Sequence, residues 1–360
     1  MGHIAKDIIA DGGTVTFVIW DDQQGHYSQK IIKDVHVVTI RVPKKRWFPD
    51  LVRQHIVFAR EFRQLIRKLK PDIVHTNFAV PSIVARWIAA KEGTPLVIST
   101  QHELYGSMSP HLRWGLRLTE KCCSAVVYVS YAVARSFGAN VAEQQSERAA
   151  SHPRHVVIPN GIDIETIRNI VADVSVRVPG RMVCAGRMVP DKGQMELVDA
   201  LPEVLRRHPH VHLHLVGSGP MEGLLRQRVD ELGLMNRVEF LGWQPHDEVL
   251  REMARAEVVI VPSKQEGFGL VIAEALTCGT PVIASDIEVL REVLANSEGD
   301  CRFFTPIEPS ALAKVIIDFP FNAAGTEPAR APKPVDALMN FSSRRMVEDY
   351  LHVYEKLNTG

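Results

Sequence analysis

Two glutamates flank a glycine-containing turn in the second half of the chain, within the string E-G-F-G-L-x-x-x-E. Glu266 precedes Gly267 and Gly269, and Glu274 follows about two turns into a stretch of helical composition. Glycines at a helix start let a ligand approach free backbone N–H groups, and the helix dipole there favours an anion such as a diphosphate. A carboxylate is repelled by phosphate but accepts hydrogen bonds from sugar hydroxyls. These residue types therefore indicate a site for a phosphate-linked sugar.

Two cations mark a second strand-to-helix junction. In G-R-M-V-P-D-K-G, Arg187 and Lys192 lie between an apolar run at 182–185 and a predicted helix at 194–207. Cations at such a junction suit a diphosphate leaving group, whose negative charge grows as its bond to the sugar breaks. The string lacks the G-K-[ST] of a Walker A loop, so it does not predict that kind of nucleotide site.

The surrounding elements predict a parallel sheet. The run 258–261 is short, β-branched and closed by Pro262, which is typical of a buried strand. A helix is expected over 270–277 with Gly279 at its end, and 280–284 is the next apolar strand. Strands alternating with helices in this way indicate an α/β fold.

The extended pattern E-G-F-G-L-x-x-x-E-A-x-x-x-G-x-P-V, together with G-R-x-x-x-x-K-G and P-N-G-I-D at 159–163, resembles the retaining glycosyltransferases of family 4. The resemblance implies the GT-B fold, in which two Rossmann-like domains face each other across a cleft. It implies a nucleotide-sugar on the second domain and an acceptor on the first. The first glutamate of the family motif contacts the donor sugar and the second the ribose, which matches Glu266 and Glu274. The positions implied around the donor are Arg187, Lys192, Gly217, Trp243, Glu266, Gly267, Phe268, Gly269, Leu270 and Glu274.

A histidine in the first half follows a predicted strand at 95–100. His102 would lie at the carboxyl end of that strand, where ligands collect in open α/β sheets. The string P-L-V-I-S-T-Q-H also resembles the family strand that ends in a histidine near the reacting centre. His75, Glu103 and Ser130 are weaker candidates, since His75 and Glu103 carry less signal and Ser130 could simply cap a helix. The predicted catalytic residues are His102, Glu266, Arg187 and Lys192.

The domain organisation predicted from these elements is an acceptor-binding domain over 1–170, a nucleotide-sugar-binding domain over 171–342 and a final helix over 343–360 that crosses back to the first domain. The chain begins with a helical stretch at 2–10, followed by a strand at 15–20. In the resembled family a first strand and a glycine-rich loop come earlier. The first strand of the N-terminal domain is therefore predicted to be missing from this sequence.

Composition is that of a globular protein, with 360 residues, 46% hydrophobic and 23% charged. No apolar run approaches the roughly 20 residues of a membrane-spanning helix, and no secretory leader is recognisable. Five cysteines show no metal-ligand spacing, and we expect free thiols in a reducing cytoplasm. The first 165 residues carry six more basic than acidic side chains and the remainder six fewer, so the first half is the one suited to an anionic partner.

A basic segment at 44–70 offers such a surface. It holds P-K-K-R-W-F-P and then a predicted basic amphipathic helix at 51–70. This combination is typical of helices that lie on anionic membranes. A helix that packs on the sheet and exposes its basic face to water would have the same sequence pattern. The prediction is a cytoplasmic protein that is either free or peripheral on the inner face of the cytoplasmic membrane. No nucleic-acid partner is expected.

The predicted activity is transfer of a hexosyl group, with retention, from a UDP- or GDP-linked donor to a glycan, lipid-linked or small-molecule acceptor. No cofactor is expected, and no Asp-x-Asp suited to a metal occurs, so the prediction is metal-independent. Double displacement and front-side attack both remain open. The alternatives are a phosphorylase or epimerase of the same fold, and a catalytically impaired sugar-nucleotide-binding or partner protein.

Overall fold

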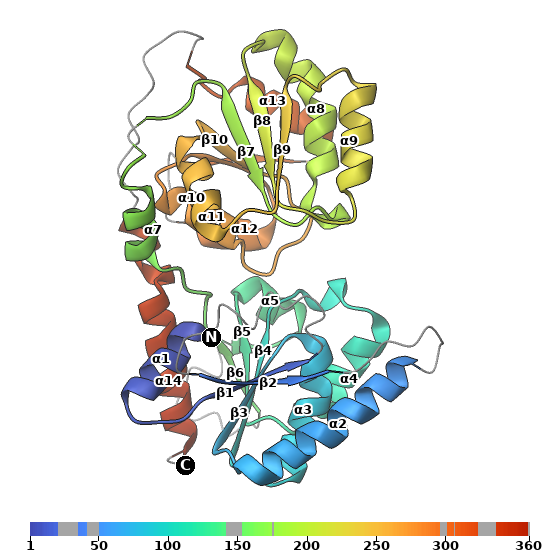
Figure 1. Ribbon diagram of the computed structural model, residues 1–360, viewed down its shortest axis with the longest axis vertical. Coiled ribbons are helices and arrows are strands. Elements are labelled where there is room, and N and C mark those ends of the chain that lie inside the picture. Colours follow the sequence, from blue (N-terminus) through green and yellow to red (C-terminus); the bar gives the residue numbers. More distant parts are fainter. Residues whose placement is uncertain are drawn as a thin grey trace. The chain divides into compact units, whose positions relative to one another are not determined.

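A computed structural model of the chain divides it into two compact units. Unit 1 comprises Met1–Pro159 with Ser343–Gly360, and unit 2 comprises Asn160–Ser342 (Figure 1). The first boundary was predicted at 170 but follows Pro159, because helix α7 (Ile164–Val171), which was not predicted, belongs to unit 2. The residues described are 1–20, 35–41, 50–141, 153–174, 176–295, 301–305, 307–322 and 336–358.

Unit 2 is built on a six-stranded parallel sheet with the order β12-β11-β10-β7-β8-β9. The chain runs outward from β7 to β9, returns to β10 beside β7, and then runs outward to β12. The strand order therefore reverses between β7 and β10, which is where open α/β sheets bind ligands. The strands are β7 (Arg181–Ala185), β8 (His212–Val216), β9 (Val238–Gly242), β10 (Val258–Val261), β11 (Val282–Ser285) and β12 (Cys301–Phe304).

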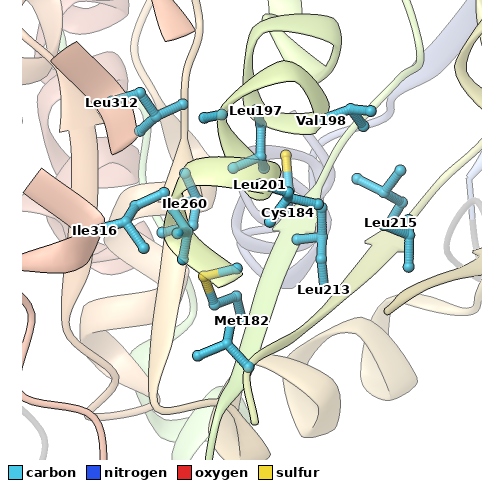
Figure 2. Close-up of a cluster of buried hydrophobic side chains, with 14 of the residues drawn as sticks. Met182, Cys184, Leu197, Val198, Leu201, Leu213, Leu215, Ile260, Leu312 and Ile316 are labelled. Atoms are coloured by element: carbon cyan, nitrogen blue, oxygen red, sulfur yellow. The ribbon is translucent and has the colours of Figure 1, made fainter. Parts of the chain in front are cut away.

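The core of unit 2 lies between one face of this sheet and helices α8 (Gln194–Arg207) and α13 (Pro309–Ile317) (Figure 2). Leu197 and Leu201, one helical turn apart on α8, are fully buried against strand residues such as Leu213. Each such side chain contributes about 1.5–3 kcal/mol by leaving water. The remaining helices of unit 2 are α9 (Glu222–Glu231), α10 (His246–Arg255), α11 (Leu270–Thr277) and α12 (Glu288–Leu294), with 3-10 turns at Pro190–Lys192 and Asp336–Phe341.

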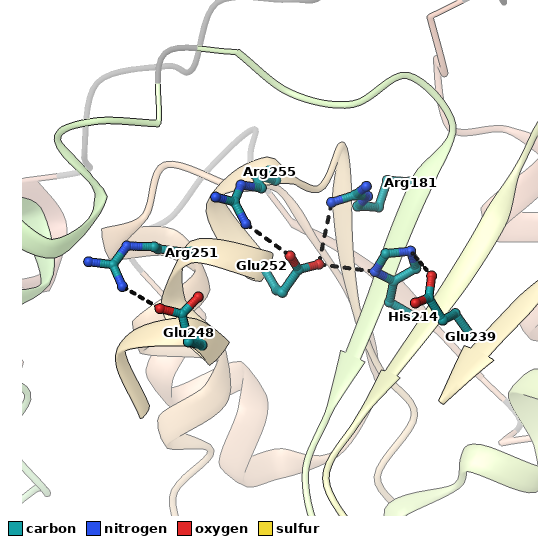
Figure 3. Close-up of polar contacts among 7 residues, drawn as sticks. All are labelled: Arg181, His214, Glu239, Glu248, Arg251, Glu252 and Arg255. Carbon is teal, nitrogen blue, oxygen red and sulfur yellow. Dashed lines mark hydrogen bonds and ion pairs between the residues drawn. The ribbon is translucent and has the colours of Figure 1, made fainter. Parts of the chain in front are cut away.

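A polar network attaches α10 to the sheet. His214 alternates along β8 with the core residues Leu213 and Leu215, so its side chain points to the opposite face. There its Nδ1 lies 3.0 Å from Glu252 of α10, which also pairs with Arg181 at 3.4 Å (Figure 3). The hydrogen bond to His214 is the main reason that the pKa of Glu252 is lowered. The network fixes α10, whose first residue reaches the candidate site described below.

Unit 1 contains two parallel sheets among its described residues, one of β1-β2 and one of β3-β4-β5-β6. The last helix of the chain, α14, packs on the first, α1, and buries Tyr350 and Val347 together with Ile98 of β4. The elements are α1 (Gly2–Ala10), β1 (Thr16–Trp20), β2 (His36–Ile40), α2 (Asp50–Leu69), β3 (Ile73–Asn77), α3 (Ala79–Lys91), β4 (Leu96–Gln101), α4 (Pro110–Glu120), β5 (Ala125–Tyr128), α5 (Tyr131–Ser136), β6 (Arg154–Val157), α14 (Ser343–Asn358) and a 3-10 turn at Tyr105–Ser107.

Helix α4 is absent from the sequence predictions, because an internal glycine weakens its helical pattern. The structure gives that glycine a packing role. A Cβ on Gly115 would lie 2.8 Å from Cδ1 of Ile83, so the missing side chain allows α4 to approach α3 closely. Tertiary packing therefore outweighs the local propensity here. None of the helices in the described part of the chain is long and apolar enough to cross a membrane.

Candidate functional site

The loops at the carboxyl ends of β7, β8 and β9 are tied together by backbone hydrogen bonds. Gly186 N–H donates to Val216 O at 2.9 Å, and Gly217 N–H donates to Gly242 O at 2.8 Å. Gly217 has φ +130°, and a Cβ there would lie 2.1 Å from the carbonyl oxygen of Gly186. Only glycine fits at this position, so the predicted Gly217 has a structural reason that does not depend on a ligand.

An ion pair joins the loop after β7 to the loop after β10. The Lys192 ammonium contacts the Glu266 carboxylate, and Ser263 Oγ donates to the same carboxylate oxygen at 2.8 Å. The Lys192 and Glu266 side chains are only 22% and 13% exposed. The pair is therefore partly shielded from water, which strengthens its attraction relative to a surface pair. Two of the predicted catalytic residues thus lie in direct contact.

Backbone contacts hold the same two loops at a fixed separation. Lys264 N–H donates to Asp191 O at 2.8 Å, and the Lys264 ammonium pairs with Glu196 at 2.5 Å. Gly193, with φ +69°, could not carry a Cβ without placing it 2.0 Å from the Pro262 carbonyl oxygen. The contact between Lys192 and Glu266 is thus built on a preorganised backbone.

The second glutamate of the motif has a partner that sequence reasoning missed. Glu274 lies on α11, and its Oε1 is 2.9 Å from Nε2 of His246, the first residue of α10. The Glu274 side chain is 15% exposed, whereas that of His246 is 56% exposed. His246 has no recognisable motif in the sequence, because it meets Glu274 only through the packing of α10 against α11.

Of the other residues predicted to contact the nucleotide-sugar, some are packed within the unit and others are exposed. Gly269 begins α11 with φ +91°, and Phe268 beside it is 3% exposed and packs edge-on against Phe341, with ring centroids 5.4 Å apart. Phe268 therefore supports the loop from within the unit. Trp243 and Leu270 are exposed at 66% and 39%. Arg187 and Gly267 lie in the loops after β7 and β10, with Arg187 exposed.

In unit 1, His102 lies directly after β4, as predicted, and contacts the end of β3. Its Nε2 is 2.9 Å from Oδ1 of Asn77, and its ring stacks on Phe78 with centroids 4.7 Å apart. Burial, reinforced by the N-terminal ammonium, lowers the pKa of His102 to about 4. The imidazole is therefore neutral at neutral pH. Asn77 and Phe78 were not predicted, although the rule that ligands collect at strand ends could have indicated both.

The weaker candidates of unit 1 have structural partners. His75 Nδ1 lies 2.7 Å from the Tyr354 hydroxyl and its Nε2 lies 2.7 Å from Thr100 Oγ1, and burial lowers its pKa to about 3. His75 therefore anchors α14 to the sheet. Ser130 Oγ accepts a hydrogen bond from Val133 N–H at 3.1 Å and caps α5. Glu103 is exposed.

Family models match both parts of the chain. The model described as Glycosyltransferase Family 4 matches residues 1–166, and the one described as Glycosyl transferases group 1 matches residues 178–322. The chain is 26% identical over 298 residues to the GDP-mannose-dependent monoacylated alpha-(1-6)-phosphatidylinositol monomannoside mannosyltransferase of Corynebacterium glutamicum, covering 78% of this chain and 74% of that protein. It is 27% identical to the GDP-mannose-dependent alpha-(1-6)-phosphatidylinositol monomannoside mannosyltransferase of Mycolicibacterium smegmatis, with coverages of 74% and 68%.

Solved structures share the fold. Sucrose-phosphate synthase from Thermosynechococcus elongatus aligns with a TM-score of 0.73 at 20% identity, covering 99% of this chain and 92% of that one. HepE of Anabaena, solved in complex with UDP and glucose, aligns with a TM-score of 0.68 at 22% identity, with coverages of 98% and 94%. The solved structures show the GT-B fold, and the family models show that the chain is a glycosyltransferase. The chain belongs to the group 1 glycosyltransferases of family 4.

Proposed function

We propose that this enzyme transfers a hexosyl group, with retention at the anomeric carbon, from a nucleotide-diphosphate sugar bound to unit 2. The contact between Lys192 and Glu266 carries the proposal. It places a cation for the diphosphate against a carboxylate for the sugar hydroxyls, at the point where the strand order reverses. Glu274, on the helix that follows the same turn and already in contact with His246, would accept hydrogen bonds from the ribose hydroxyls.

The chemical task is to stabilise a diphosphate whose negative charge grows as the glycosidic bond breaks. Lys192 and Arg187 supply positive charge from the loop after β7, and the start of α11 supplies the positive end of a helix dipole. In the structure the Lys192 ammonium contacts the Glu266 carboxylate. We propose that a bound diphosphate draws the ammonium toward itself while Glu266 turns to the sugar hydroxyls. Because the protein supplies this charge, the proposed reaction needs no metal ion.

GDP-mannose is the donor that we favour, and a lipid-linked inositol glycan the acceptor class. The support is that two relatives covering most of this chain are GDP-mannose-dependent enzymes that act on phosphatidylinositol monomannosides. A UDP-linked hexose is the competing donor.

Nucleotide titration of the purified chain tests the proposal. Thermal shift would be measured with GDP, UDP, ADP and their hexose conjugates, with and without EDTA. We expect a shift with GDP and GDP-mannose that EDTA does not alter. Glu274→Ala and Lys192→Ala should remove it, whereas the matched substitutions Glu231→Ala on α9 and Lys314→Ala on α13 should not.

Three outcomes would contradict parts of the proposal. A thermal shift with UDP and its conjugates alone would identify a UDP-linked sugar, and not GDP-mannose, as the donor. Loss of the shift in EDTA would refute metal independence. No shift with any nucleotide from a folded protein would favour a non-catalytic binding protein of the same fold.

We also propose that unit 1 adsorbs to anionic membrane surfaces through α2. The central apolar side chains of this helix are not available to lipid, because Phe58, Phe62 and Ile66 are at most 6% exposed and Phe58 stacks on Trp20 at 4.3 Å. Only Ile56 and Leu69, at 62% and 41%, are exposed large hydrophobic residues in the described part of α2. The exposed basic side chains of α2 are Arg60, Arg67 and Lys68, and Lys70 follows the end of the helix. Arg67 is already paired with Glu92 at 2.7 Å. Adsorption through α2 would therefore be electrostatic and sensitive to salt. The basic-aromatic segment 44–49 lies outside the described residues.

Liposome co-sedimentation tests this surface. Binding to vesicles with anionic phosphatidylinositol should exceed binding to neutral phosphatidylcholine and should fall as salt rises from 50 to 300 mM. Reversing Lys68 and Lys70 to Glu should weaken it. Equal binding to both vesicle types at low salt would reject the proposal.

A further inference from the structure

Phe78, between β3 and α3, has a backbone conformation that side chains rarely adopt. Its φ is +65° and its ψ is 152°, in a region that is essentially reserved for glycine. Only one other non-glycine residue in the described part of the chain, Lys70, has a positive φ. Such strain persists where the surroundings enforce it, and it concentrates at functional positions.

The surroundings do enforce it. The Phe78 carbonyl oxygen accepts hydrogen bonds from the backbone N–H of Ser82 at 3.4 Å and from the Ser82 hydroxyl. Ser82 is fully buried in α3 and its hydroxyl has no exposure to water. These two hydrogen bonds hold the Phe78 backbone in place, while 56% of the surface of the residue remains exposed. More than half of Phe78 is exposed, so the burial of its ring offers little to offset the strain of its backbone.

Asn77 sets the hydrogen-bonding state of the neighbouring imidazole. Because Oδ1 of Asn77 can only accept, the 2.9 Å contact makes Nε2 of His102 the protonated nitrogen. The low pKa of His102 keeps the other nitrogen, Nδ1, as a lone-pair acceptor at neutral pH. Among the residues that the structure describes, no hydrogen bond reaches Nδ1. An unused acceptor thus lies beside an exposed aromatic face.

We propose that Asn77, Phe78 and His102 form a carbohydrate-binding site in unit 1, the aromatic site, which takes a pyranose or cyclic polyol ring of the acceptor. One face of Phe78 stacks on His102, and the other would pack on the C–H face of the ring. The negative face of an aromatic ring attracts the weakly positive C–H edge of such a ligand. A ring hydroxyl would donate to Nδ1 of His102. Asn77 is a positioning residue, since it acts through His102.

The site is neutral, which indicates the part of the acceptor that it recognises. None of its three side chains carries a charge at pH 7, so the three side chains themselves suit an uncharged ring. The assignment to the acceptor rests on the proposed function, in which unit 2 takes the nucleotide-sugar.

Saturation-transfer NMR with methyl α-mannopyranoside, methyl α-glucopyranoside and myo-inositol tests the aromatic site, with glycerol as the acyclic control. We expect saturation of ring C–H protons in at least one of the three rings, and none in glycerol. Phe78→Ala should weaken binding about tenfold, as for loss of one aromatic stack. Phe78→Trp should preserve it. Trp114→Ala, which removes a more exposed aromatic ring from α4, should change nothing.

Phe78→Gly separates function from folding. Glycine accepts φ +65° without strain, so this variant should melt at a higher temperature than Phe78→Ala while losing ring binding to the same extent. For Asn77, the readout is the ¹⁵N spectrum of His102. Asn77→Ala should convert a single Nε2–H tautomer into a mixture, whereas Phe78→Ala should not.

The outcomes separate this inference from the proposed function. Absence of ring binding in the wild-type chain, or full binding in Phe78→Ala, would overturn the aromatic site even if GDP binds to unit 2. Ring binding that depends on Phe78 would support it even if no nucleotide binds.

Discussion

The strand-end loops of unit 2 and the aromatic site of unit 1 position their side chains by different means. In unit 2 a shielded ion pair, Lys192 with Glu266, is supported by glycines that bring backbone segments into contact. In unit 1 a neutral histidine is oriented by an amide and stacked on a strained phenylalanine. A diphosphate calls for charge and close backbone approach, whereas a sugar ring calls for aromatic area and directed hydrogen bonds. The two sites thus differ in the way that the proposed donor and acceptor would require.

The largest expected effect tests the charged side of this comparison. Lys192→Ala should lower kcat by a factor of ~10²–10³, corresponding to ~2.7–4 kcal/mol of barrier. The reason is the loss of a preorganised cation that stabilises the departing diphosphate. The measurement is initial rate of GDP release from GDP-mannose with saturating acceptor. Lys314→Ala serves as the matched control. An unchanged kcat would show that the ion pair is merely structural.

Backbone packing in unit 2 should be the next most sensitive feature. Gly217→Ala places a Cβ 2.1 Å from the Gly186 carbonyl oxygen at φ +130°, so it should destabilise the unit by roughly 1–3 kcal/mol or more. Chemical denaturation would measure the loss. The control is Gly223→Ala in α9, where a Cβ meets nothing within 4 Å and stability should be unchanged or slightly higher. Equal stability of the two variants would contradict the tight contact between the loops.

Acid should distinguish the two units by their stability. His75 of unit 1 has its pKa lowered from 6.5 to about 3, so the unfolded chain binds the proton first. This contribution is complete above pH 6.5 and is lost as pH falls toward 3, at about 1.4 kcal/mol for each pH unit. Glu252 of unit 2 has its pKa lowered from 4.5, so its contribution is complete above pH 4.5 and is lost only below it.

Calorimetric melts at pH 7, 6 and 5 would therefore show a larger loss of stability in unit 1, where the pKa values of His75 and His102 are lowered to about 3 and about 4, than in unit 2, where burial also lowers the pKa of His212. His75→Gln should reduce the pH dependence of the stability of unit 1 between pH 7 and 5. Glu252→Gln should leave the pH dependence of the stability of unit 2 in this range unchanged. If both units lost stability together and His75→Gln had the wild-type slope, the burial of a neutral His75 would not be the cause.

The smallest expected effect concerns Ser130. Helix α5 begins with this side-chain cap, whereas α11 begins with Gly269, which supplies none. Ser130→Ala should cost about 1 kcal/mol of stability without altering kcat or KM. Ser107→Ala in the neighbouring 3-10 turn, which removes an exposed hydrogen bond of 2.7 Å to the Leu104 carbonyl oxygen, should cost less. A fall in kcat with Ser130→Ala would instead assign that hydroxyl to the reaction.

Sequence patterns predicted much of unit 2, because its site lies within short strings. Strand 258–261 and helix 270–277 have the predicted bounds, and the helix after Lys192 begins at Gln194 as expected. Each pattern couples a local backbone requirement to a residue type, such as glycine before α11. His246 escaped prediction, since it reaches Glu274 from another helix 28 positions away.

Unit 1 was predicted less completely. His102 was correctly expected at a strand end, whereas His75, also expected at a strand end, lies in the middle of β3. The sequence does not show whether such a histidine anchors a helix or faces a ligand. His75 acquires its structural role from Tyr354, 279 residues later in the chain. Helix α4 was not predicted, because Gly115 disfavours a helix locally. The advantage of glycine at this position is the close contact with Ile83 of α3, which only the packed structure shows.

The sequence by itself determined the α/β class, the family and the positions of the charged motif residues, because these depend on periodicity and on strings within about ten residues. Only the tertiary structure decided which polar groups meet. It joined Lys192 to Glu266, Glu274 to His246 and His102 to Asn77, and it showed Phe78 held in a glycine-like conformation. Those contacts cross between separate strands and helices, and packing alone fixes the distances between them.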